Sequence, residues 1–235
     1  MSAPLPPDTA PPPRDGRSAP GTPSPPLACA ASAGYLAVKH ACDRAVAAAA
    51  LLVSAPLLLG IGLAIRWTSA GPALFRQVRA GRGGRPFTLL KFRTMRLEAD
   101  PYGDSPQSGA DPRLTRIGRW LRERSLDELP QLINVLRGEM SLVGPRPLYP
   151  QQMAEWNERQ RGRLLVKPGL TGLAQIGGRG SLTLEDKLEL DVQYVETIGL
   201  RTDLRVLWRT FVGLWRRADI YEVRYSRERS RRGGD

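Results

Sequence analysis

The sequence predicts a small, mainly helical domain of the α/β class with one short β-hairpin, joined to a long apolar helix. Three observations predict this fold. Residues 45–65 form a run of 21 residues without a charged side chain. Residues 73–92 contain two apolar stretches separated by a glycine-rich turn, which is typical of a hairpin. From residue 111 onward, several segments repeat apolar side chains at helical spacing.

The apolar run over residues 45–65 has the length of a membrane helix. At ~1.5 Å per residue it forms a helix of roughly 30 Å, the thickness of a hydrocarbon core. A buried core helix is the alternative. Pro56 lacks a backbone N–H and should kink the helix, with Ser54 as a local hydrogen-bonding partner. Basic residues such as Lys39 and Arg66 flank both ends. Positive charge prefers the cytoplasm, so we expect a re-entrant helix that enters and leaves through one leaflet.

The ends of the chain have the composition of tails. The first 26 residues contain ten prolines, and the last residues are polar and rich in arginine. Such segments cannot bury a core. We therefore expect a disordered tail over 1–34, a re-entrant helix over 35–66, a folded domain over 67–221 and a basic tail over 222–235. The apolar run begins too late for a secretory signal.

The folded domain is expected to begin with strands in residues 73–78 and 86–92, followed by a mobile loop over 97–110. Asp111 as N-cap and Pro112 at the first helical position predict a helix from residue 112. A second helix should begin at Leu126 and end at Gly138. Residues 141–150 are too rich in proline for regular structure.

The second half of the domain should hold a polar helix over 153–165, a glycine-rich loop over 167–180 and a helix over 184–197. The last helix, over 203–217, carries an apolar stripe beside a row of arginines. It is either an amphipathic core helix or an interfacial helix that lies in the headgroup plane. The stripe consists of Leu204, Leu207, Trp208, Phe211 and Trp215.

Composition limits the partners. Lys and Arg number 35 against 23 Asp and Glu, so the formal charge is +12. This excess suits nucleic acid, anionic lipid or a phosphorylated substrate. Two cysteines and one histidine argue against a disulfide framework and a histidine-rich zinc site, and they favour a reducing, cytosolic environment.

Asp127 and Glu128 form an adjacent pair of carboxylates just before Pro130. Ser125 and Glu128 fit the spacing of a helix capping box. Pro130 would then fall inside the helix and break a hydrogen bond, which strains that interpretation. The functional alternative is that one carboxylate attacks phosphorus while the other holds Mg²⁺. The sequence pattern leaves both interpretations open.

A site for phosphate chemistry also needs cations near the carboxylates, because guanidinium groups hold phosphate oxygens. Prolines on both sides of Arg146 should restrict its backbone and fix its guanidinium in advance. The candidate phosphate-binding residues are Arg122, Arg146 and Arg179.

The chain resembles the bacterial sugar transferase family, the monotopic phosphoglycosyl transferases that act on a polyprenol phosphate. Three ordered motifs carry the resemblance, at residues 76–95, 111–147 and 167–179. Fainter similarity extends it over residues 39–221. It implies a small α/β catalytic domain on the cytoplasmic face of the inner membrane, anchored by a re-entrant helix and interfacial helices. It also implies Mg²⁺, a UDP-sugar donor and undecaprenyl phosphate as acceptor.

Carried onto this chain, the resemblance makes Asp127 the nucleophile and Glu128 the metal ligand. Asp127 would attack the β-phosphorus, release UMP and hold the sugar phosphate until undecaprenyl phosphate takes it. The three arginines align with family arginines associated with phosphate. The basic surroundings are expected to keep the pKa of Asp127 low. Hexose and N-acetylhexosamine donors both stay open, as does a homodimer.

The chain departs from the family pattern in three places. The helix break reads Ser54-Ala55-Pro56 rather than Ser-Pro, which affects hydrogen bonding at the bend. Gly177 precedes Gly178 and Arg179 where asparagine is common, which affects substrate recognition. Larger relatives carry additional N-terminal spans, so this chain resembles the short form.

Two other functions remain to be weighed. A nucleic-acid-binding protein would explain the charge but not the apolar run, and no base-reading motif occurs. A non-catalytic, membrane-anchored basic scaffold would explain the anchor but not the carboxylate pair among arginines.

Overall fold

The computed structural model describes residues 28–100, 103, 105–106, 108–178 and 182–216. Within these residues the protein is mostly helical, with one antiparallel and one parallel pair of short strands. This confirms the mainly helical domain with a hairpin. The elements are α1 (Ala33–Thr68), β1 (Leu74–Ala80), η1 (Arg82–Gly84), β2 (Pro86–Phe92), α2 (Arg116–Glu123), η2 (Leu126–Glu128), α3 (Gln131–Arg137), β3 (Ser141–Val143), η3 (Pro150–Glu155), α4 (Glu158–Arg161), η4 (Gly162–Leu165), β4 (Gly169–Thr171), α5 (Leu173–Ile176), α6 (Leu184–Thr197) and α7 (Leu200–Arg216), where η denotes a 3₁₀ turn.

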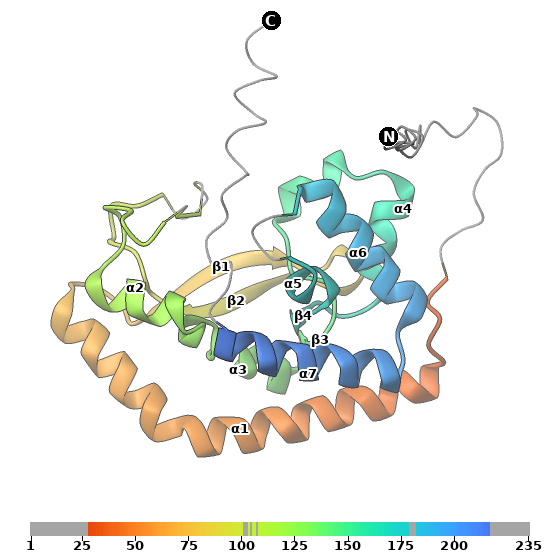
Figure 1. The fold of residues 1–235 in the computed structure, drawn as a ribbon, viewed down its shortest axis with the longest axis horizontal. Helices are drawn as coiled ribbons and strands as arrows, with labels where there is room; N and C mark the ends of the chain where they lie inside the picture. The colour runs from red at the N-terminus through yellow and green to blue at the C-terminus, as the bar shows by residue number, and fades with distance from the viewer. Residues whose placement is uncertain (1–27, 101–102, 104, 107, 179–181, 217–235) are drawn as a thin grey trace, which may run out of the picture.

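The long helix α1 extends along one whole side of the molecule and bends near its middle (Figure 1). Pro56 lies within it, and the Ser54 hydroxyl donates to the Ala50 carbonyl at 2.6 Å. A proline interrupts helical hydrogen bonds and is an ordinary cause of a kink. By length and composition, α1 is the one helix in the described part of the chain that could cross a membrane. Only 11% of its most apolar window is buried, which argues against a core helix.

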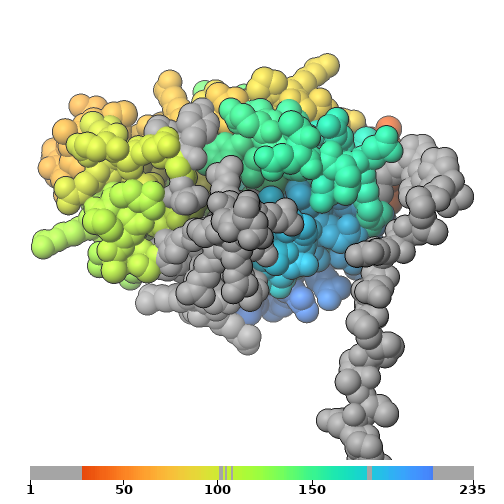
Figure 2. Space-filling model, turned by 90° about the horizontal axis from the view of Figure 1, so that it is seen from above, coloured from red at the N-terminus to blue at the C-terminus, as the bar shows by residue number. Residues whose placement is uncertain are grey.

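Both halves of α1 pack against the same domain. Ala47 contacts the buried side chains Leu132 and Val135 of α3, while Ile61 and Ile65 pack with Phe92 and Leu121. Seen from above, the domain hides α1 except near its two ends (Figure 2).

The N-terminal half of α1 is also tied to the domain by polar contacts. Lys39 forms ion pairs with Asp203 at 2.9 Å and Asp43 at 3.5 Å, and its side chain is buried. Asp43 in turn accepts a hydrogen bond from Ser141. Lys39 was expected as a flanking charge at the membrane surface. It is instead buried and paired inside the protein, with Asp43 one turn along α1 and with Asp203 of the distant helix α7.

The predicted hairpin is confirmed. β1 and β2 pair antiparallel from Leu74 opposite Phe92 to Ala80 opposite Pro86. The turn between them contains Gly83 and Gly84, both with positive φ, a conformation that glycine adopts without a steric penalty.

The predicted start of the next helix is wrong. α2 begins at Arg116, and Thr115 caps it by accepting from the Gly118 N–H at 2.9 Å. The Asp111 carboxylate is engaged by the backbone and guanidinium of Arg113 instead. The end of α3 is as expected, since Gly138 lies at its C-cap with φ 79°.

Residues 141–150 and 167–180 were expected to be irregular, but β3 and β4 form a short parallel pair. Glycines permit it: a Cβ at Gly169 would lie 2.1 Å from the Gly144 nitrogen, so only glycine fits. The expected polar helix over 153–165 is broken into η3, α4 and η4. These turns and the β3–β4 pair hold residues 144–147 against the core, with Gly144, Pro145 and Pro147 buried and Arg146 partly exposed.

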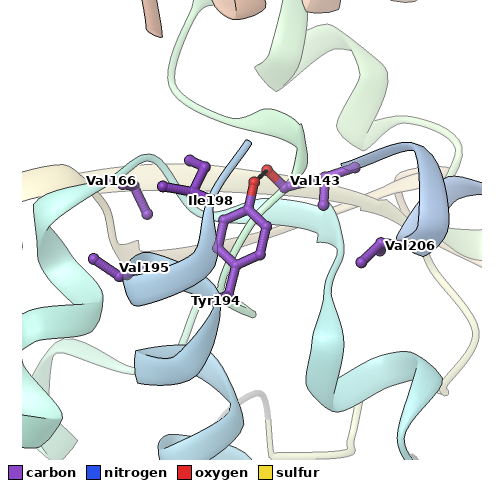
Figure 3. Packing of buried hydrophobic residues seen from close by; sticks show 6 residues of the cluster. All are labelled: Val143, Val166, Tyr194, Val195, Ile198 and Val206. Atoms are coloured by element: carbon purple, nitrogen blue, oxygen red, sulfur yellow. Dashed lines mark hydrogen bonds between the residues drawn. The ribbon is translucent and has the colours of Figure 1, made fainter. Parts of the chain in front are cut away.

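The core that supports this segment lies between β3, α6 and α7. Tyr194 is buried among Val143, Val195 and Val206, and its hydroxyl donates to the Val143 carbonyl at 3.0 Å (Figure 3). α6 covers the predicted residues 184–197.

The last helix presents its apolar stripe outward. Leu204, Trp208 and Phe211 are 56%, 67% and 57% exposed, so the alternative of a core helix is wrong for these residues. The side chain of Trp215 lies outside the described part, as do the residues of both expected tails before 28 and after 216.

Candidate active site

The two carboxylates of the candidate dyad lie in the turn η2, between α2 and α3. Ser125 enters this turn with φ 55°, the left-handed region, and its side chain makes no capping hydrogen bond. The capping-box interpretation is therefore wrong. Positive φ is uncommon for a residue with a side chain and concentrates at functional turns. Asp127 is 7% exposed, whereas Glu128 faces a pocket.

Glu128 lies between two cations. Its Oε1 atom is 3.0 Å from Lys91 Nζ and 3.4 Å from Arg146 Nη2. Lys91 comes from β2, while Arg146 follows β3, so three separate segments converge on one carboxylate. Burial lowers the pKa of Lys91, and the Glu128 charge opposes that shift. The sequence reasoning missed Lys91; the available signal was a lone lysine inside the apolar strand PFTLLKF.

The environment of Asp127 differs from expectation. Burial raises the pKa of its carboxyl group, and the neighbouring Glu128 raises it further, while Lys91 and Arg122 lower it. The expected low pKa is wrong for the protein without substrate, because the basic field does not outweigh the loss of hydration.

Arg122 reaches the site from α2. Its Nε atom donates to Thr94 Oγ1 at 2.9 Å, and its charge acts on Asp127. The close approach of α2 to Thr94 depends on Gly118, where a Cβ would lie 1.9 Å from the Thr94 carbonyl oxygen. Arg122 of α2 thus acts on Asp127, while Arg146, which follows β3, contacts Glu128.

A small, solvent-open pocket lies beside Glu128. Arg79 of β1, another residue that the sequence reasoning missed, lines it together with Lys91 and Arg146. The Arg79 guanidinium stacks over the Tyr149 ring at 3.7 Å and donates to the Pro147 carbonyl at 3.3 Å. Three cations around one pocket create a site that favours polyanionic ligands.

The other predicted site residues lie elsewhere. Arg179 falls outside the described residues. Ser54 and Pro56 belong to the middle of α1 and shape that helix rather than the pocket.

The dyad also suits the expected Mg²⁺. In the described part of the chain, no cluster of three or more His, Cys, Asp or Glu side chains could hold a metal ion by itself. Mg²⁺ is usually bound by one or two carboxylates together with substrate phosphates, so it needs no such cluster. Glu128 lines the cationic pocket, so its carboxylate fits the role of a protein ligand for an ion that is shared with a diphosphate.

The chain is similar in sequence to known proteins over most of its length. The family model for bacterial sugar transferases matches residues 34–217. A UDP-glucose:undecaprenyl-phosphate glucose-1-phosphate transferase of Caulobacter vibrioides is 48% identical in an alignment of 183 positions that covers 72% of this chain and 67% of the relative. EpsL of Bacillus subtilis, an uncharacterized sugar transferase, is 44% identical over 173 residues, which are 74% of this chain and 85% of EpsL.

Longer relatives share the same region. A UDP-glucose:undecaprenyl-phosphate glucose-1-phosphate transferase of Escherichia coli is 39% identical in an alignment of 181 positions that covers 74% of this chain but 39% of the relative. The matched region contains the dyad, Lys91, Arg122 and Arg146. The chain belongs to the bacterial sugar transferase family.

Proposed function

We propose that this protein transfers a sugar 1-phosphate from a UDP-sugar to undecaprenyl phosphate and releases UMP. The observation that carries the proposal is the buried Asp127 next to Glu128, which lines a pocket together with Lys91, Arg146 and Arg79. A non-catalytic scaffold would have no need for a buried carboxylate pair held among cations. The names of several relatives make UDP-glucose the first donor to test.

The transfer takes place in two displacements. A carboxylate oxygen of Asp127 attacks the β-phosphorus of the donor, and the bond from that phosphorus to the oxygen bridging the two phosphates breaks. UMP leaves with the electron pair, and an aspartyl-phosphosugar remains. A phosphate oxygen of undecaprenyl phosphate then attacks the same phosphorus, which frees Asp127 and gives the polyprenol diphosphosugar.

The surrounding residues stabilise the charge that develops on the transferred group. Phosphoryl transfer depends mainly on positioning and on electrostatic stabilisation of the equatorial oxygens. Arg146, Lys91 and Arg79 face the pocket and would bind the diphosphate, while Arg122 lies beside Asp127. Glu128 would hold Mg²⁺, which would add positive charge at the phosphate oxygens.

The burial of Asp127 suits a covalent intermediate. An acyl phosphate is hydrolysed by water, and a side chain that is 7% exposed offers water little access. The cost of this burial is opposed by Lys91 and Arg122, which favour the ionised carboxylate needed for attack.

UMP release tests the proposed function directly. The full chain in detergent with Mg²⁺ and undecaprenyl phosphate is expected to release UMP from UDP-glucose or from another donor in a panel containing UDP-galactose and UDP-N-acetylglucosamine. Without the acceptor, release should stop at one UMP per protein, because the sugar phosphate stays on Asp127. No UMP from any donor would contradict the proposal. Equal turnover with and without acceptor would contradict the covalent route.

We also propose that α1 is a re-entrant helix in the inner membrane, with the domain and both ends of α1 on the cytoplasmic side. The bend in α1 and its exposed apolar side chains support an inserted helix (Figure 1). The packing supports the re-entrant path, because Ala47 in the first half and Ile65 in the second are both fully buried against one domain. The exposed stripe of α7 supports a place in the headgroup plane.

A cysteine introduced at Ser18, in a variant without Cys29 and Cys42, tests this topology. In intact cells it should resist a membrane-impermeant thiol reagent and react only after permeabilisation. Pro56→Leu should straighten the helix and make part of the population reactive from outside, since a continuous apolar helix of this length can span. Strong labelling of the cysteine variant without the Pro56 change would overturn the re-entrant topology.

A further inference from the structure

A buried ion pair lies behind the segment that carries Arg146. Arg163 of η4 and Asp191 of α6 approach to 2.6 Å between Nη2 and Oδ2, and both side chains are 3% exposed. The Arg163 guanidinium also packs over the Trp156 ring at 4.8 Å. Neither side chain lines the pocket beside Glu128.

The same ion pair holds the backbone of Arg146 on both sides. The Arg146 N–H donates to Asp191 Oδ1 at 3.4 Å, and the Arg146 carbonyl accepts from Arg163 Nη2. Because Pro145 and Pro147 have no N–H, Arg146 supplies the one backbone donor in this tripeptide. The carboxylate and the guanidinium thus fix both polar groups of a single peptide residue, whose side chain then reaches Glu128.

A buried ion pair adds little to the free energy of unfolding. Desolvation of two buried charges offsets much of their attraction, and apolar replacements of buried pairs are often neutral or stabilising. The adjacent turn, α4, is joined to α6 by Arg159, which binds Glu189 and Glu196 at the surface. Unlike these exposed ion pairs, the buried pair of η4 and α6 also contacts the backbone of Arg146, the residue that reaches Glu128.

We propose that Arg163 and Asp191 are positioning residues for the transfer, which act through Arg146 by fixing its peptide so that its guanidinium points at the dyad and the donor diphosphate. The proposal rests on the proposed function, since it assigns these residues a part in the same reaction. The prolines restrict φ around Arg146, and the ion pair selects which of the remaining orientations the peptide takes.

Amide hydrogen exchange of the full chain in detergent tests the positioning itself, without any substrate. Asp191→Asn should speed exchange at Arg146, within a peptide covering residues 142–148, by about tenfold or more, because the amide of asparagine cannot pair with Arg163 as a charge does. Arg159→Ala, which removes the surface ion pairs between the adjacent helix α4 and α6, should leave that exchange unchanged. Unaltered exchange at Arg146 in Asp191→Asn would overturn the positioning role.

A double-mutant cycle tests whether the pair acts through Arg146. Asp191→Asn alone should lower kcat for UMP release by about 30-fold or more, yet by less than about threefold in the Arg146→Ala background, because coupled residues are non-additive. A purely structural role would lower kcat equally in both backgrounds, and that result would overturn the proposal. Arg163→Lys, which keeps the charge but loses the fork, serves if Asp191→Asn does not fold.

The two experiments separate the possible failures. If the wild-type chain releases no UMP from any UDP-sugar, the proposed function fails and the catalytic part of this inference fails with it. If the wild type releases UMP but Asp191→Asn leaves the exchange rate at Arg146 unchanged, only the positioning role is overturned.

Discussion

Asp127→Asn should abolish UMP release while the protein stays folded and bound to the membrane. The amide is close to the carboxylate in size, so it fits the buried site, but it has no anionic oxygen to attack phosphorus. We expect turnover to fall by a factor of at least about 10³, or ~4 kcal/mol of activation free energy. Because burial and the adjacent Glu128 destabilise the charge of Asp127, loss of that charge should not lower the melting temperature.

Intact-protein mass spectrometry distinguishes loss of the nucleophile from general damage. With a UDP-sugar and no acceptor, the wild-type chain should gain the mass of a sugar phosphate, and Asp127→Asn should gain none. Asp100→Asn, in the exposed segment between β2 and α2, provides a matched control and should behave as the wild type. Near-normal turnover by Asp127→Asn would remove this residue from the role of nucleophile.

Arg146→Lys should lower kcat/KM by about 10²-fold although the positive charge is kept. A guanidinium can bind two phosphate oxygens in parallel, whereas an ammonium acts as a single point charge on a flexible stem. Arg146 already reaches Glu128 at 3.4 Å from a backbone fixed on both sides. Because the backbone at residue 146 is held in place, a lysine there could not move to replace the lost contacts, and it would bind the diphosphate less tightly.

Steady-state kinetics with the preferred UDP-sugar measure this effect, and Arg159→Lys supplies the control. Arg159 also makes forked contacts, to Glu189 and Glu196, but at the surface and away from the pocket. The control should keep wild-type kcat/KM. An unchanged kcat/KM for Arg146→Lys would mean that the two flanking prolines serve only the fold of this segment.

Several features of this protein are encoded locally and could be predicted from sequence. The hairpin follows from alternating apolar residues around a glycine-rich turn, and both its strands pair as expected. Gly138 ends α3 because the left-handed conformation at a C-cap favours glycine. The helix over residues 184–197 follows from helical spacing. In each case the residues that determine the structure are neighbours in the chain.

Features that depend on distant contacts were missed. β3 and β4 pair across more than twenty residues, and their approach depends on glycines that fit each other rather than on strand propensity. The site residues Lys91 and Arg79 have no local motif; they become visible only when the hairpin is placed beside Glu128. The buried position of Lys39 likewise depends on its ion pair with Asp203, which lies far along the chain.

The sequence alone determined the apolar helix with its central proline, the adjacent carboxylates and the surplus of arginine, because these are properties of consecutive residues or of composition. Only the tertiary structure determined what the charges do. From sequence, the arginines near Asp127 predicted a low pKa; in the folded protein its burial raises the pKa instead. Hydration is lost when distant segments close over a side chain, so the balance between desolvation and Coulomb attraction exists only once the chain has folded.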